Sequence, residues 1–81
     1  MDFEALTKKI NESLKDLEIF VDEIKKMKKG KYLFLEITLD KVGGIDLDEI
    51  VEATNIINPI VDELDLIKEE YILDIISKER G

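Results

Sequence analysis

The stretch DKVGGIDLDEI, residues 40–50, places two adjacent glycines between a strand-like apolar run and a helix-like run. Phosphate-binding loops occupy this kind of position. A P-loop needs a lysine and a serine or threonine after its last glycine, because these groups hold the phosphates and Mg²⁺. Gly44 is instead followed by IDLDE, and three acids within one helical turn would repel a phosphate. P-loop chemistry is therefore excluded.

The same stretch does not fit two other glycine-containing binding loops. A dinucleotide-binding fingerprint fails because Gly43 and Gly44 are adjacent and no third glycine follows. A calcium-binding EF-hand fails because the acids have the wrong spacing and no glutamate closes a twelve-residue loop. The acids suit the positive end of a helix dipole themselves. The sequence therefore predicts a structural turn, in which Gly43 and Gly44 supply positive φ, and a helix capped by Asp46.

The chain contains no histidine and no cysteine. It therefore lacks the usual general base and the commonest metal ligand, and histidine-dependent triads are impossible. It also lacks a thiolate nucleophile and a disulfide framework. The acids of the second helical region are explained by capping and by exposed polar positions, so no carboxylate pair indicates catalysis. We expect a non-enzymatic protein with no cofactor and no metal site.

The net charge of −8 lies entirely in the second half of the chain. Residues 1–41 contain nine acids and nine lysines, whereas residues 42–81 contain eleven acids and three bases, a balance of 3 − 11 = −8. An acidic surface repels nucleic acid and attracts basic partners, mainly by raising the rate of encounter. Acids also simply keep a small protein soluble. The charge pattern leaves both interpretations open.

The length of 81 residues predicts a single domain, residues 1–81. No apolar run approaches the roughly 18–20 residues that a membrane span requires. The N-terminal MDFEALTKKI carries two acids and no apolar core, so it does not read as a signal peptide. We expect a cytoplasmic monomer that does not contact a membrane.

An amphipathic helix is predicted over residues 2–17, DFEALTKKINESLKDL. Its apolar residues recur at i, i+3, i+7, i+11 and i+14 and form one narrow stripe, namely Phe3, Leu6, Ile10, Leu14 and Leu17. Asp2 is the expected N-cap. The stripe is too short for a stable coiled coil, so we expect it to pack in the core of the domain.

A β-hairpin is predicted to follow. GKYLFLEITLD alternates with period two, so Leu33, Leu35, Ile37 and Leu39 share one face, while Tyr32 and Phe34 suggest that the other face is partly covered. Residues 19–27 read as the partner strand, and their irregular alternation indicates a bulge or an edge position. Five lysines would then decorate the exposed hairpin and either protect a sheet edge or bind phosphate, namely Lys25, Lys26, Lys28, Lys29 and Lys31.

A second helix is predicted from Leu47, with Asp46 as N-cap and Glu49 completing a capping box. Its core face is expected to consist of Leu47, Ile50, Thr54, Ile57 and Val61. Pro59 falls inside this helix, removes a backbone donor and clashes with the preceding turn, so we expect a kink or an early stop. EYILDIIS, residues 70–77, is the third predicted strand, with Tyr71, Leu73 and Ile75 on one face.

The resulting order, α-β-β-α-β, predicts a small α+β domain in which a three-stranded sheet carries two helices packed on one face. The third strand follows a helical crossover, so it should run parallel to the second strand with a right-handed connection. Placed beside the first strand it would complete an antiparallel sheet, and placed beside the second it would form a mixed sheet. Periodicity leaves both arrangements open.

Several of these segments together resemble the N-terminal domain of the ribosome maturation factor RimP family. A strand ending in Asp40, the turn with Gly43 and Gly44, and IDLDE opening a helix match that domain in type and order. YILDIIS, residues 71–77, is similar to the family's Tyr-x-Leu-Glu-Val-Ser-Ser strand and lies at the expected distance. The resemblance covers nearly the whole chain, and its specificity comes from the ordered spacing.

The chain also departs from the family pattern. After Ile76 it reads SKERG, where the family continues into Pro-Gly-Leu-Asp-Arg-Pro, and Pro59 stands where the family has another residue. The family's C-terminal β-barrel domain is absent from residues 1–81. The resemblance implies a non-enzymatic factor that assists maturation of the small ribosomal subunit by binding ribosomal components, with a basic ribosomal protein as the expected partner. The alternative is an acidic protein-interaction or dimerisation module unrelated to ribosomes.

A protein-binding surface is predicted on the second helix. On a helical wheel five residues fall within an arc of about 80° on the side away from the predicted core, namely Glu49, Glu52, Ile56, Pro59 and Glu63. Ile56 would be an apolar anchor among acids, as suits a basic partner. Direct nucleic-acid binding is expected to be weak or absent, at most through Lys25–Lys31, because the second half is acidic and the Gly-x-x-Gly loop of KH modules is missing.

Overall fold

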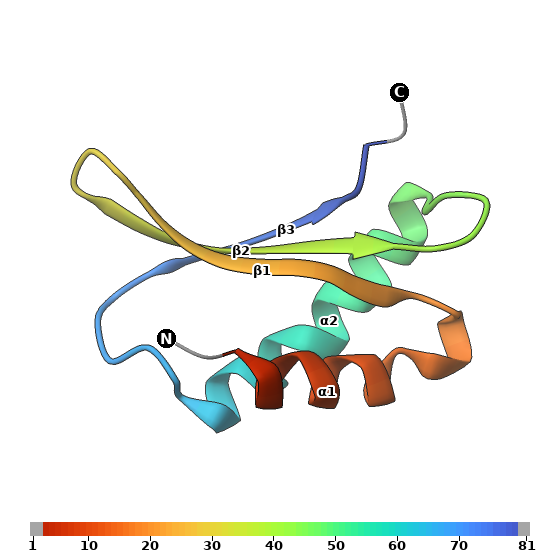
Figure 1. The fold of residues 1–81 in the computed structure, drawn as a ribbon, viewed down its shortest axis with the longest axis horizontal. Helices are drawn as coiled ribbons and strands as arrows, with labels where there is room; N and C mark the ends of the chain where they lie inside the picture. The colour runs from red at the N-terminus through yellow and green to blue at the C-terminus, as the bar shows by residue number, and fades with distance from the viewer. Residues whose placement is uncertain (1–2, 80–81) are drawn as a thin grey trace.

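The computed structural model describes residues 3–79. Its elements follow the predicted order and comprise α1 (Glu4–Ser13), a 3₁₀ turn η1 (Lys15–Leu17), β1 (Phe20–Lys29), β2 (Tyr32–Asp40), α2 (Leu47–Leu64) and β3 (Ile72–Ser77). The three strands form one layer, and both helices lie against the same face of it (Figure 1). The predicted α+β architecture is therefore confirmed.

The sheet is mixed, with the strand order β1-β2-β3. β2 pairs antiparallel with β1 and parallel with β3, with Leu35 opposite Leu73 and Ile37 opposite Ile75. Of the two arrangements that periodicity left open, the structure therefore has the one in which β3 lies beside β2. β2 has the most regular apolar face of the three strands. Its central place in the sheet allows this face to be covered along the whole strand by the helices and by the side chains of both neighbouring strands.

A bulge in β1 explains its irregular sequence pattern. The register between β1 and β2 shifts between Val21 and Glu23, so Val21 lies opposite Leu39 and Ile24 lies opposite Ile37. The extra residue lets two apolar side chains three positions apart face the same side of the sheet. β1 is also an edge strand. Both explanations offered by the sequence, a bulge and an edge position, apply.

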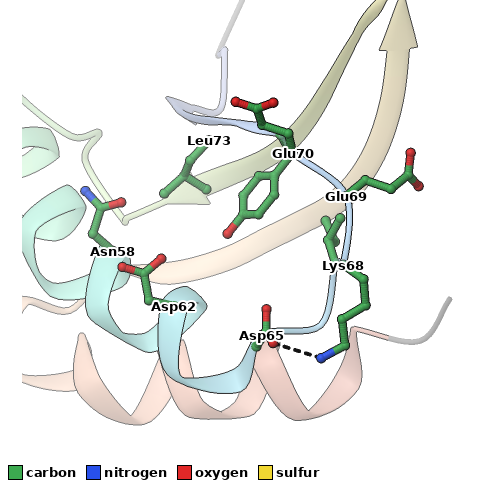
Figure 2. A pocket seen from close by; sticks show the side chains of 9 residues that line it. Asn58, Asp62, Asp65, Lys68, Glu69, Glu70 and Leu73 are labelled. Atoms are coloured by element: carbon green, nitrogen blue, oxygen red, sulfur yellow. Dashed lines mark hydrogen bonds and ion pairs between the residues drawn. The ribbon is translucent and has the colours of Figure 1, made fainter.

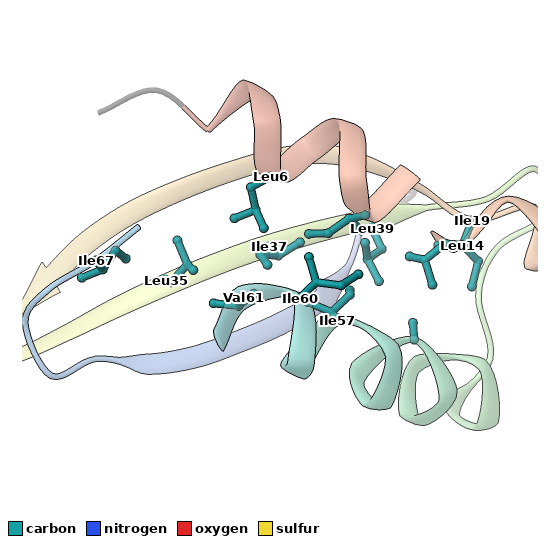
Figure 3. Close-up of a cluster of buried hydrophobic side chains, with 12 residues drawn as sticks. Leu6, Leu14, Ile19, Leu35, Ile37, Leu39, Ile57, Ile60, Val61 and Ile67 are labelled. Atoms are coloured by element: carbon teal, nitrogen blue, oxygen red, sulfur yellow. The ribbon is translucent and has the colours of Figure 1, made fainter. Parts of the chain in front are cut away.

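The hydrophobic core fills the space between the sheet and the helices (Figure 3). Its largest fully buried side chains are Leu6, Ile10, Leu14, Ile19, Leu35, Ile37, Leu39 and Ile57. The stripe predicted for α1 is thus buried at its centre, and its end residues Phe3 and Leu17 pack partly buried against the core. The helix itself is shorter than predicted, ending at Ser13. The predicted cap Asp2 lies outside the described residues.

The predicted core face of α2 needs a correction. Leu47 is 83% exposed, and the buried residues of the helix are Ala53, Ile57, Ile60 and Val61. Relative to the prediction, the buried face is rotated by about 60° around the helix axis. Leu47 was predicted to be buried because it is large and apolar. Ala53 was not predicted to be buried because its side chain is small.

Pro59 does not end α2, which continues to Leu64. The expected early stop is wrong. Pro59 and Asn55 are both exposed, so the carbonyl left without an intrahelical donor faces the solvent side, where water can bind it. The helix ends at Asp65, which adopts a left-handed conformation with φ 45° and donates its N–H to the Val61 carbonyl at 3.0 Å.

No helix among residues 3–79 covers the second face of the sheet (Figure 1). Tyr32 is 54% exposed there, so the partial cover expected for this face does not extend to it. Phe34 is half-buried, and the Lys29 ammonium lies 5.7 Å from the centre of its ring. Ile72 and Ile76 of β3 are also exposed. This helix-free face is therefore partly apolar.

Candidate protein-binding site

The glycine pair forms the turn that the sequence predicts. Gly43 and Gly44 have φ of 87° and 92°, and the Gly44 N–H donates to the Lys41 carbonyl at 2.9 Å. The hollow beside them, of about 400 Å³, is lined by the acidic side chains of Asp46 and Glu49. Carboxylates on this wall disfavour a phosphate, so the turn serves to reverse the chain and start α2.

The capping box at the start of α2 is complete. The Asp46 carboxylate accepts the Glu49 N–H at 2.8 Å, and the Glu49 carboxylate accepts the Asp46 N–H at 3.1 Å. The Lys41 ammonium also donates to Glu49, joining the end of β2 to the helix. This bond from Lys41, followed by the Asp46 N–H, lowers the pKa of Glu49, and the bond to Glu49 raises the pKa of Lys41. Glu49 thus stabilises the start of α2 and its connection to β2.

The structure separates the five residues predicted to bind a protein. Glu52, Pro59 and Glu63 are exposed on α2. Glu49 is half-buried in the cap, and Ile56 is partly buried and packs against the core. Ile56 lies about 80° from the centre of the buried face. Its expected place as an exposed anchor among acids is therefore wrong, and three of the five residues share an open surface.

The exposed apolar residues of α2 are Leu47 and Val51. They lie four positions apart and are neighbours on the helix surface. Val51 is 59% exposed and next in sequence to Glu52. Neither residue was predicted to be exposed or to bind, because the predicted buried face of α2 lies too close to Leu47. A wheel centred on Ala53 and Ile57 would have found them.

A second acidic area lies between the end of α2 and β3. An open recess of about 490 Å³, here called the α2–β3 recess, has Asn58 and Asp62 of α2 on one side and Leu73 of β3 on the other (Figure 2). Asp65, Lys68, Glu69, Glu70 and Tyr71 also line it. Lys68 donates to Asp65 at 2.8 Å, and Lys26 of β1 lies 3.9 Å from Glu69, so the four acids of the recess outnumber the two cations near them.

Tyr71 reports the electrostatics of this recess. Burial raises the pKa of its hydroxyl above the ordinary value, and the charges of Asp62 and Asp65 raise it further. A second negative charge is therefore unfavourable here, whereas a positive charge would be favourable. From the sequence, the two aspartates were expected only at exposed polar positions. The recess could not be predicted, because the loop that closes it has no regular pattern.

The lysines of the hairpin are mostly engaged with neighbouring side chains. Lys25 lies 3.6 Å from Glu36, and Lys26 lies 3.9 Å from Glu69. The ammonium of Lys31 lies 5.7 Å from the centre of the Tyr32 ring. These contacts, and the edge position of β1, favour the protection of a sheet edge over phosphate binding.

Within residues 3–79, no group of histidine, cysteine, aspartate and glutamate side chains has the arrangement of a metal site. None of the helices in this part of the chain is long and apolar enough to cross a membrane. Exposed carboxylates lie on α2 and around β3, and they can attract positively charged groups.

The sequence of this fold matches a known family over most of its length. Residues 6–78 match the RimP N-terminal domain. The chain belongs to this family. The match includes α2, all three strands and α1 from Leu6 onward, so the resemblance seen in the sequence is confirmed. RimP is a ribosome maturation factor, so this family has a role in the maturation of ribosomes.

Proposed function

We propose that this RimP N-terminal domain is a non-enzymatic binding module that assists maturation of the small ribosomal subunit in the cytoplasm. The observation that carries the proposal is the family match over residues 6–78. The charge distribution adds to it, because the whole excess of −8 lies in residues 42–81. Ribosomal proteins that bind RNA are basic, and an acidic surface favours their encounter.

The proposed contact surface is the exposed side of α2, centred on Glu52, Pro59 and Glu63. Val51 is exposed, lies at the border of this surface next to Glu52 in sequence, and takes the anchoring role that the sequence assigned to Ile56. Glu49 remains at the border of the surface, but its bonds to Asp46 and Lys41 tie it to the fold. The partner is proposed to be a basic ribosomal protein of the small subunit.

Co-sedimentation with isolated small and large ribosomal subunits tests the proposal. The domain should sediment with the small subunit and not with the large one. The double variant Glu52→Lys with Glu63→Lys should slow association and flatten its dependence on salt, because it removes attraction at the surface. Val51→Ala should mainly speed dissociation.

A matched control makes the same change of charge elsewhere. Glu12→Lys with Asp16→Lys reverses two exposed acids in α1 and η1, outside the proposed surface. This variant should associate like the parent chain. Equal binding to both subunits, or unchanged association after reversal of Glu52 and Glu63, would contradict the proposal.

A further inference from the structure

The two outer edges of the sheet differ in how well they are protected against pairing with a further strand. β1, at one edge, carries a bulge and lysines at four of its ten positions, which are common ways to prevent pairing with another strand. β3, at the other edge, reads ILDIIS and has one charged residue, Asp74, and no proline. Among residues 3–79 no strand lies on its outer side. β3 is thus an open, apolar edge.

The backbone groups that β3 offers follow from one hydrogen bond. The Lys78 N–H donates to the Leu39 carbonyl of β2 at 2.7 Å. Backbone groups of successive residues in a strand point alternately to the two neighbours. The backbone N–H and C=O groups of Ile72, Asp74 and Ile76 therefore point toward β2. Those of Leu73, Ile75 and Ser77 point outward.

A strand added at this edge would meet two different surroundings. Side chains on its helix side would enter the α2–β3 recess, where the four acids Asp62, Asp65, Glu69 and Glu70 outnumber two cations, Lys68 and the Lys26 that lies 3.9 Å from Glu69. Side chains on its other side would lie next to Ile72 and Ile76, which are 45% and 38% exposed. The edge therefore fits an extended segment in which basic and apolar residues alternate.

We infer that the outer edge of β3 binds an extended basic segment of a partner protein by strand addition, with the cationic side chains in the α2–β3 recess. Charge complementarity selects this occupant. Pairing of two copies of the chain through β3 would bring two acidic recesses together, which repulsion opposes. The inference rests on the proposed function only for the source of the segment, a basic ribosomal protein.

Hydrogen exchange by NMR with a synthetic peptide tests the edge directly. The probe is a short peptide of alternating lysine and valine with blocked ends, and the control is a peptide of the same composition with its lysines and valines in separate blocks. The alternating peptide should slow exchange of the Leu73, Ile75 and Ser77 amides, which are free to exchange in its absence. The Asp74 and Ile76 amides, bonded to β2, should change little.

Two variants should weaken binding of the alternating peptide. Ser77→Pro removes an outward N–H at an edge position that tolerates proline, so affinity should fall about fivefold, as for one lost hydrogen bond. Ser77→Ala is its control. Asp62→Asn with Asp65→Asn removes charge from the recess, and asparagine suits the left-handed conformation of residue 65. Glu12→Gln with Asp16→Asn is the matched control, and both controls should bind as the parent does.

Three results would overturn the inference. The block peptide could protect the same amides equally well, which would indicate charge attraction alone. Protection could fall outside β3. Protection could also appear without peptide and grow with protein concentration, which would indicate a second copy.

Sedimentation of Ser77→Pro with the small subunit distinguishes the two proposals. If this variant binds as well as the parent chain, the edge is not the contact and the proposed function stands. If the alternating peptide binds the edge but the parent chain does not bind the small subunit, the edge stands and the proposed function fails.

Discussion

Gly43 and Gly44 hold φ values that L side chains adopt only with strain, yet a Cβ at either position would meet no atom within 4 Å. The cost of Gly43→Ala or Gly44→Ala is therefore conformational rather than steric, about 1–2 kcal/mol each. Urea denaturation measures this loss. Gly→Asn at the same positions should cost less, since asparagine tolerates positive φ better, and equal losses for alanine and asparagine would contradict the explanation.

The bond between Lys41 and Glu49 gives stability a dependence on pH. Lys41→Met should be less stable than the parent chain at neutral pH. Because the pKa of Glu49 lies below its ordinary 4.5, its contribution is present above that pH and is lost as the pH falls through the lower folded value. The difference between variant and parent should therefore shrink in acid.

The same difference should also shrink in alkali. The pKa of Lys41 is raised above 10.5, so its contribution is present below that pH and disappears as the pH rises through the higher folded value. Thermal melts of both proteins across the pH range check this prediction. A difference that stays constant at low pH would show that Glu49 does not provide the stabilising charge.

At the scale of elements, the core joins the end of α1 to the central strand β2. Leu14 and Leu35 are almost fully buried. Leu14→Ala or Leu35→Ala should cost about 2–4 kcal/mol, from lost apolar burial and the cavity left behind. Chemical denaturation measures the change. Leu47→Ala is the control, because Leu47 is 83% exposed and the same substitution there should cost little.

Pro59 lowers the stability of the helix that contains it. α2 runs through this position, but proline cannot donate to the preceding turn and is poorly suited to a helix interior. Pro59→Ala should therefore stabilise the domain, by about 1–3 kcal/mol. A denaturation midpoint that falls in this variant would mean that the ring of Pro59 provides packing that outweighs its backbone cost.

The elements with regular periods could be predicted from the sequence. The alternation Leu33, Leu35, Ile37 and Leu39 identified β2, and the pairing of Asp46 with Glu49 identified the start of α2. The phase of α2 could not be set as well, because the fully buried Ala53 has a small side chain that gives little hydrophobic signal. The position of β3 depends on tertiary packing, which periodicity does not encode.

The candidate sites also divide into local features that the sequence predicts and features that depend on tertiary packing. Gly43, Gly44 and Asp46 act locally, and their roles were predicted from their neighbours in sequence. The α2–β3 recess combines Asp62, Tyr71 and Leu73, which only the crossover brings together. The binding role of Glu52, Pro59 and Glu63 stays a prediction until it is measured.

At the scale of the whole molecule, the core should hold the domain together without a ligand. Helix and sheet signals in circular dichroism and the tyrosine fluorescence should then disappear in one transition with coincident midpoints. Addition of a chelator should leave this midpoint unchanged. A lower midpoint with chelator would indicate a metal that contributes to folding.

The order of the strands has a consequence for the kinetics of folding. β1 and β2 are joined only by Gly30 and Lys31, so this hairpin forms from local contacts and can form early. β3 reaches β2 only after the chain between them, including α2, has closed a long loop, and such pairings are slow. Formation of the parallel ladder is thus the expected rate-limiting step. Until it is complete, the bare edge of β2 is where a folding intermediate would begin to aggregate.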